Sequence, residues 1–182
     1  LSMILSLPCT VGMFVLARPL LTLLYSSLDG TELDMAVYLL RLLSPSVIML
    51  GVSQLCSGVL QGCGRTVMPV LSMALGAMLK IFIGLWLIKI PEINITGAAI
   101  GTLLCFGVSA LIDLALCKKY SGMRIDIRDC LLSPLIASLG MGVVIFIVDG
   151  YVKGATGTLL SILAGVFVYA IILIAVGGLR PE

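Results

Sequence analysis

Four charged side chains lie inside long apolar stretches of the sequence, where a charge is energetically costly. They are Arg18, Arg41, Lys80 and Asp113. An ionisable group deep in a lipid bilayer costs about 3 kcal/mol on insertion scales, and it usually faces a cavity or a charged partner. Guanidinium and ammonium groups bind phosphate and carboxylate. The pattern therefore predicts non-covalent contact with an anionic or polar ligand, and no catalytic residue is expected.

Arg41 stands four residues before Pro45, in a stretch that also carries Gln54 on its polar face. Proline bends membrane helices, and the freed backbone groups must then find other partners or a cavity. We therefore predict that Arg41 lines a water-filled cavity, with Gln54 and Arg18 as candidate lining residues. Arg18 has an alternative, because a long side chain can extend its charged group to the membrane surface.

Lys80 and Asp113 belong to two series of small and polar residues with four-residue spacing. The series are Ser72, Gly76, Lys80 and Gly84, and then Gly97, Gly101, Cys105, Ser109 and Asp113. Residues four apart share one helix face, and small residues let two helices approach closely. Helix packing explains the glycines and serines but not Lys80, which we predict to be a second cavity cation. Asp113 lies nearer a helix end, too far along for a direct pair with Lys80, and is a candidate gate or ion-coupling residue.

The elements that must position these residues follow from composition. The chain is 60% hydrophobic and only 11% charged, with a mean hydropathy of +1.25, whereas soluble domains carry about 25% charged residues. We predict an all-α integral membrane protein, because about 20 apolar residues cross a bilayer as a helix. Six spans are expected, at residues 1–24, 36–61, 67–88, 95–117, 131–148 and 158–176.

The loops between these spans alternate in charge. The loop "SSLDGTELD" has three acids, whereas "KKYSGMRIDIRD" has four bases, and Arg65 and Arg180 lie on the same side as the basic loop. Basic loops stay in the cytoplasm, so both ends of the chain are expected to be cytoplasmic. A net charge of +2 gives no reason to expect nucleic-acid binding. The chain has no histidine and its six cysteines show no metal-ligand spacing, so we expect no cofactor, no metal and no enzyme.

Three stretches carry a resemblance to a known family. They are "LPCTVGMFVLARPLLTLLY", "LLSPSVIMLGVSQLCSGVLQGCGRTVMPV" and "KIFIGLWLIKIPEINITGAAIGTLLCFGVSALIDL". In order and pattern they resemble the C-terminal half of stage V sporulation protein B-like polysaccharide transporters. These belong to the multidrug/oligosaccharidyl-lipid/polysaccharide exporter superfamily. The resemblance implies a two-lobed, MATE-like transporter whose first lobe precedes this chain.

The resemblance also implies a division of the chain and a function. Residues 1–117 would supply four helices of the second lobe, residues 118–130 a basic cytoplasmic loop, and residues 131–177 a C-terminal pair of helices. The substrate would be an undecaprenyl-diphosphate-linked saccharide, flipped across the bacterial cytoplasmic membrane by alternating access. A diphosphate gives Arg41 and Lys80 a chemical role. The partners would be that lipid-linked saccharide, membrane lipids and the first lobe of the same chain.

Two other functions fit the same residues. A cation-coupled multidrug exporter of the same superfamily would use a deep carboxylate to bind an ion, and Asp113 is the candidate for that role. A non-transporting membrane subunit of an envelope-biosynthesis complex would need the glycine series for assembly but not Arg41 or Lys80. Substitution of the two cations distinguishes these possibilities.

Overall fold

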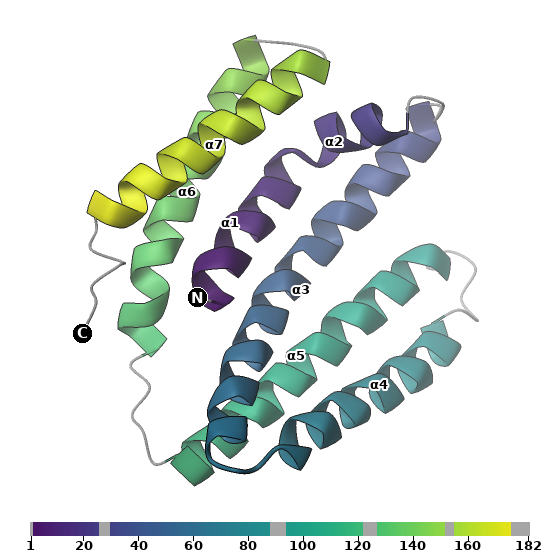
Figure 1. The fold of residues 1–182 in the computed structure, drawn as a ribbon. Coiled ribbons are helices and arrows are strands. Elements are labelled where there is room, and N and C mark those ends of the chain that lie inside the picture. Colours follow the sequence, from purple (N-terminus) through teal and green to yellow (C-terminus); the bar gives the residue numbers. More distant parts are fainter. Residues whose placement is uncertain (1, 26–29, 88–93, 122–126, 152–154, 176–182) are drawn as a thin grey trace. The chain divides into compact units, whose positions relative to one another are not determined.

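The computed structural model describes residues 2–25, 30–87, 94–121, 127–151 and 155–175 of the chain. Within these ranges the regular structure consists of α-helices, and no strand is present, which confirms the predicted all-α class (Figure 1). The helices are α1 (Ser2–Val15), α2 (Ala17–Leu24), α3 (Gly30–Gly62), α4 (Val67–Leu87), α5 (Asn94–Ser121), α6 (Ile127–Tyr151) and α7 (Ala155–Ala175).

Several of these helices are long and apolar enough to cross a membrane. Four pass this test alone, namely α3, α4, α5 and most of α7, and the bent pair α1 and α2 would supply a fifth span. The described apolar part of α6, Pro134–Asp149, is shorter than the other four. The structure therefore confirms a multi-pass membrane protein, while the predicted number of six spans remains a prediction.

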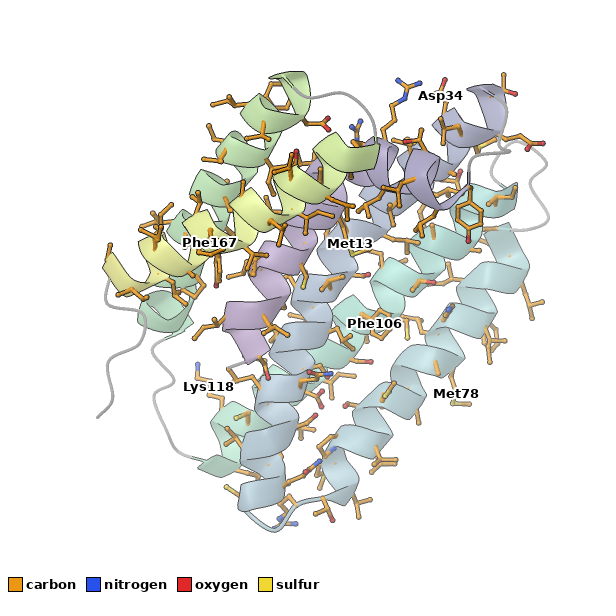
Figure 2. The ribbon with its side chains drawn as sticks, turned by 45° about the horizontal axis from the view of Figure 1, so that its top comes forward. Met13, Asp34, Met78, Phe106, Lys118 and Phe167 are labelled. Carbon is orange, nitrogen blue, oxygen red and sulfur yellow. The ribbon has the colours of Figure 1, made fainter. Side chains whose placement is uncertain are left out.

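Large apolar side chains project from α4 and α7 away from the packed interior. On α4, Phe82 and Trp86 are 80% and 73% exposed, and on α7, Phe167 is 69% exposed (Figure 2). Apolar surface of this extent is rare on soluble proteins. It fits helices whose outer faces contact lipid, since the hydrocarbon core of a bilayer solvates such side chains.

The chain forms two compact units. Unit 1 contains Leu1–Met3 and Pro45–Ile125, and unit 2 contains Ile4–Ser44 and Asp126–Glu182. Helix α3 contributes its second half to unit 1 and its first half to unit 2. The division into residues 1–117, 118–130 and 131–177 that the resemblance implies remains a prediction.

In unit 1, helices α4 and α5 pack side by side in antiparallel directions (Figure 1). Gly76 faces Cys105 and Ser109, and one turn further along α4, Lys80 lies beside Gly101. A step of one turn toward the C-terminus of α4 therefore corresponds to a step of one turn toward the N-terminus of α5, as expected for antiparallel helices. The two series of small residues predicted from the sequence form this interface.

In unit 2, helices α6 and α7 form a second antiparallel pair (Figure 1). Ile145 of α6 lies against Gly165 of α7, where the absence of a side chain lets the helices approach closely. Ile145 also forms a buried cluster with Met141 and with Leu16, which lies between α1 and α2. This cluster anchors the junction of α1 and α2 against the C-terminal pair.

The first predicted span is broken rather than merely kinked. Helix α1 ends at Val15, α2 begins at Ala17, and their axes differ by 75°. The cause lies at Pro19, which has no N–H to donate to the carbonyl of Val15 and whose ring would collide with that carbonyl. Together the two helices are apolar enough to form one bent span, so the single span over residues 1–24 remains a prediction, to which the structure adds the break at Leu16.

Three other prolines lie inside continuous helices, namely Pro8, Pro45 and Pro134, and at the first two a side-chain hydroxyl satisfies the carbonyl that the proline leaves free. Pro8 cannot donate to the carbonyl of Ile4, which accepts a 2.6 Å hydrogen bond from the Tyr169 hydroxyl. Pro45 cannot donate to the carbonyl of Arg41, which accepts a 2.8 Å bond from the Ser44 hydroxyl. The backbone around Arg41 is thereby satisfied without breaking α3.

Candidate functional site

Unit 2 contains an open pocket of about 830 Å³ beside the break between α1 and α2. This volume lies within the range of small-molecule binding sites. Its lining combines aromatic, aliphatic and charged side chains from both sides of the break and from α3, α6 and α7. The lining residues are Phe14, Val15, Arg18, Pro19, Thr22, Leu23, Arg41, Phe146, Asp149 and Thr158.

Arg41 reaches this pocket from α3 and is anchored by the broken helix. Its Nε donates a 3.3 Å hydrogen bond to the carbonyl of Phe14, and its Cζ lies 5.7 Å from the centroid of the Phe14 ring. Phe14 lies in the last turn of α1, where carbonyls lack intrahelical partners. The break therefore supplies the acceptor that orients the guanidinium group.

The charge of Arg41 has no carboxylate partner among the residues that the structure describes. One of its donors is used by the Phe14 carbonyl, and the planar guanidinium group has five N–H donors in total. The other donors make no hydrogen bond to the residues that the structure describes, and they are available to an anion in the pocket that Arg41 lines. Arg41 can thus bind a phosphate in the bidentate manner typical of arginine.

Arg18 lines the same pocket from α2 and pairs with Asp34 at the start of α3. The Nη2–Oδ1 distance is 2.8 Å, and the two side chains are 60% and 66% exposed (Figure 2). An ion pair this exposed contributes about 0–1 kcal/mol. Arg18 is therefore held near the pocket by a contact that a competing anion can replace at small cost.

Two acidic residues of this region were not predicted. Asp34 belongs to the acidic loop that the sequence analysis used only for orientation, and its pairing with Arg18 depends on the bend at Leu16. Asp149 lies at the end of the apolar part of α6, and no spacing in the sequence connects it with the arginines. Asp34 reaches Arg18, and Asp149 reaches the pocket that both arginines line, only through the tertiary structure of unit 2.

The other predicted cavity residues belong to unit 1. Lys80 is exposed on α4, and its Cγ lies where it would contact a side chain added at Gly101 of α5. Gln54 is exposed on α3. Neither lines the pocket of unit 2, so a cavity role for Lys80 and Gln54 remains a prediction.

Asp113 is the most deeply buried charged residue in unit 1, with 1% of its surface exposed. Its Oδ2 accepts a hydrogen bond from Ser53 of α3, and its Oδ1 accepts one from Ser72 of α4. Ser109 of α5 donates a 3.2 Å bond to the carbonyl of Ser72. Three helices thus meet at one carboxylate.

This arrangement agrees with one prediction about Asp113. Lys80 is not among its partners, as expected from the difference in depth. Helix α5 continues to Ser121, so Asp113 lies about 12 Å from the end of the helix, and its position near the membrane surface remains a prediction. Ser53 was not predicted, because nothing in its spacing distinguishes it from other small residues of α3.

A carboxylate surrounded by hydroxyl oxygens can accept a proton or a monovalent cation. Among the described residues, no group of three His, Cys, Asp or Glu side chains that could hold a metal ion comes together. The part of the chain that the structure describes contains an arginine pocket in unit 2 and a buried carboxylate in unit 1.

Comparison with known proteins gives two matches. Residues 1–86 match the MatE family. The lipid II flippase MurJ of Bacillus subtilis (strain 168) is 27% identical over 178 residues, which cover 94% of this chain. The chain spans 31% of the length of this relative. No solved structure matches this chain. The resemblance predicted from the sequence is therefore confirmed: the chain is similar to the MatE family and to a lipid II flippase, members of the multidrug/oligosaccharidyl-lipid/polysaccharide exporter superfamily.

Proposed function

We propose that this chain is part of a flippase that moves an undecaprenyl-diphosphate-linked saccharide across the bacterial cytoplasmic membrane. The observation that carries the proposal is Arg41, a cation without a carboxylate partner in a pocket within an otherwise apolar bundle. The similarity to a lipid II flippase supports the substrate class. Transport is non-covalent, both ends of the chain are cytoplasmic, and a first lobe of the same protein completes the alternating-access unit.

Arg41 and Arg18 have different roles in this proposal. Arg41 is fixed by the Phe14 carbonyl and binds the diphosphate with its remaining donors. Arg18 exchanges its exposed partner Asp34 for the second phosphate, which costs little because the pair is exposed. Lys80 is proposed as a further cavity cation, reached at another stage of the transport cycle.

Asp113 is proposed as the gate or ion-coupling residue. It joins α3, α4 and α5 through Ser53 and Ser72, so a change in its protonation or in a bound cation would alter the packing of all three helices. A carboxylate inside a membrane marks an ion or proton pathway in many transporters. The depth of this site is the one observation that also favours the second candidate function, a cation-coupled multidrug exporter.

The decisive experiment uses the full-length protein in proteoliposomes with a fluorescent undecaprenyl-diphosphate saccharide. Arg41→Gln removes the charge while keeping a polar side chain of similar length, and Arg41→Lys keeps the charge but loses the bidentate geometry. We expect about a tenfold or greater loss of transport for Arg41→Gln and a smaller loss for Arg41→Lys. Full activity of Arg41→Gln, with normal insertion, would refute the proposed substrate site.

The same variants separate the candidate functions. A cation-coupled multidrug exporter would need Asp113 to bind the coupling ion but would not need Arg41, so Asp113→Asn would abolish drug efflux while Arg41→Gln would leave it intact. A non-transporting subunit would tolerate substitution of both residues in a cell-growth complementation assay. The flippase requires Arg41 in the transport assay.

A further inference from the structure

A second group of cations lies in unit 1, outside both sites described above. It consists of Arg65, between α3 and α4, and of Lys118 and Lys119 near the end of α5, with Tyr120 beside them (Figure 2). The three cations are exposed. They lie where three membrane-crossing helices end or begin, which is the depth at which lipid head groups are found.

The backbone fixes the position of Arg65. Helix α3 ends in a Schellman motif: Gly64 has a φ of 74°, its N–H donates to the carbonyl of Gln61, and the N–H of Arg65 donates to the carbonyl of Leu60. A positive φ suits glycine because it has no Cβ. The turn therefore presents Arg65 in one defined place rather than on a loose loop.

Tyr120 fixes the side chain of Arg65. The Cζ of Arg65 lies 4.8 Å from the centroid of the Tyr120 ring, and the Nζ of Lys119 lies 5.6 Å from the same centroid. Both distances are within the range of a cation–π interaction. Two like charges beside one ring repel each other, and an anion between them would remove that repulsion.

None of the three cations has a carboxylate partner among the residues that the structure describes. The negative end of the α5 dipole accounts for part of the preference for lysine at this place. It does not account for Arg65, which lies on a different segment and is directed onto Tyr120 by a specific turn. Membrane orientation by basic loops likewise requires positive charge here but not a fixed geometry.

The geometry points to a binding site for the phosphate of an anionic phospholipid, formed by Arg65, Lys119 and Tyr120 with Lys118 adding charge. Head groups of anionic lipids attract basic residues next to membrane helices, at about fivefold in affinity for each lysine or arginine. The site would bind a lipid of the surrounding bilayer between the ends of α3, α4 and α5. This inference does not depend on the proposed transport function.

The test measures lipid retention by the full-length protein in nanodiscs that contain equal amounts of phosphatidylglycerol and phosphatidylcholine. Native mass spectrometry counts the lipids that remain bound after release. We expect Arg65→Gln or Lys119→Gln to lower phosphatidylglycerol retention about fivefold and the double variant about twenty-fivefold, with phosphatidylcholine unchanged. The matched control is Cys63→Ser, an exposed uncharged residue close to Arg65 that is outside the proposed site, and it should retain the lipid.

Three results would overturn the proposal. They are unchanged phosphatidylglycerol retention in the double variant, an equal loss of both lipids, and displacement of the lipid by inorganic phosphate at the same concentration. The second result would indicate a general change in packing, and the third would indicate a site for free phosphate. The Arg65→Lys variant guards against misfolding, because it keeps the charge and should lose less affinity than Arg65→Gln.

Discussion

Replacing Gly76 by alanine tests whether close packing of α4 and α5 holds unit 1 together. A Cβ at this position would lie 2.2 Å from the Ser109 hydroxyl oxygen and 2.7 Å from the carbonyl oxygen of Cys105. The hydroxyl can rotate away, but the carbonyl belongs to the backbone of α5. Ordinary contacts begin at 3.4 Å, so the two helices would have to separate by about 0.7 Å.

The energetic cost of this separation combines two effects. Overpacking of an interior costs about 1–3 kcal/mol. Displacement of Ser109 also weakens its bond to the Ser72 carbonyl, which is worth about 0.6 kcal/mol in a membrane. The better helix propensity of alanine returns about 0.5–1 kcal/mol. We therefore expect Gly76→Ala to lower the free energy of unfolding by about 1–2 kcal/mol.

Gly101→Ala is the matched control on the facing helix. A Cβ there would meet Cγ and the carbonyl oxygen of Lys80 at 3.7 Å, an ordinary contact, so stability should be unchanged or higher by up to about 1 kcal/mol. Unfolding of the full-length protein by a denaturing detergent in mixed micelles measures both variants under one condition. Equal stability of Gly76→Ala and Gly101→Ala would refute the proposed close contact.

Three further predictions concern single contacts, each measured by the same unfolding assay. Tyr169→Phe should cost about 1–2 kcal/mol, because the Ile4 carbonyl loses its donor and Pro8 cannot replace it; an unchanged stability would contradict this. Asp113→Asn should remain within about 1 kcal/mol of the native protein, whereas Asp113→Leu should lose about 2–4 kcal/mol, since the asparagine oxygen can accept from one serine and its NH2 can donate to the hydroxyl oxygen of the other. Gly64→Ala should cost about 1 kcal/mol through its left-handed backbone, and a stabilised variant would show that the turn has another conformation.

The packing of α4 against α5 could be predicted from the sequence because it depends on helix geometry alone. Four-residue spacing places Gly76 and Lys80 on one face whatever surrounds the helix. The facing residues, Gly101 and Cys105, follow the same spacing on the neighbouring helix. The positions of Lys80 and Asp113 along their helices also predicted correctly that the two side chains do not pair, because distance along a helix is proportional to residue number.

The partners of the charged residues could not be predicted in the same way. Ser53 approaches Asp113 from α3, which is 60 residues earlier in the chain, and its small side chain follows no periodic pattern. The length of the helix that carries Asp113 was underestimated because the apolar pattern ends near Cys117, whereas the helix itself continues to Ser121. Hydropathy marks the part of a helix that lipid can solvate, and the backbone hydrogen bonds continue beyond it.

The prolines show most clearly which contacts follow from neighbouring residues in the sequence and which arise only in the folded chain. Each proline in a helix leaves free the carbonyl four residues earlier, and that position can be read from the sequence. At Pro45 the donor is the adjacent Ser44, so the continuity of α3 follows from neighbouring residues. At Pro8 the donor is Tyr169, which is 165 residues away from the acceptor, and only the folded chain reveals it.

At the break before Pro19, the helix ends instead of continuing past the proline. The chain bends by 75°, and the last carbonyls of α1 become acceptors for groups outside the helix. Arg41 uses one of them, that of Phe14, and is thereby directed into the pocket. Where a hydroxyl donates to the freed carbonyl, as at Pro45 and Pro8, the helix continues past the proline. At the break before Pro19, a backbone oxygen at the end of α1 instead orients a cation, so the charge of Arg41 is positioned by the end of α1 rather than by a break in its own helix.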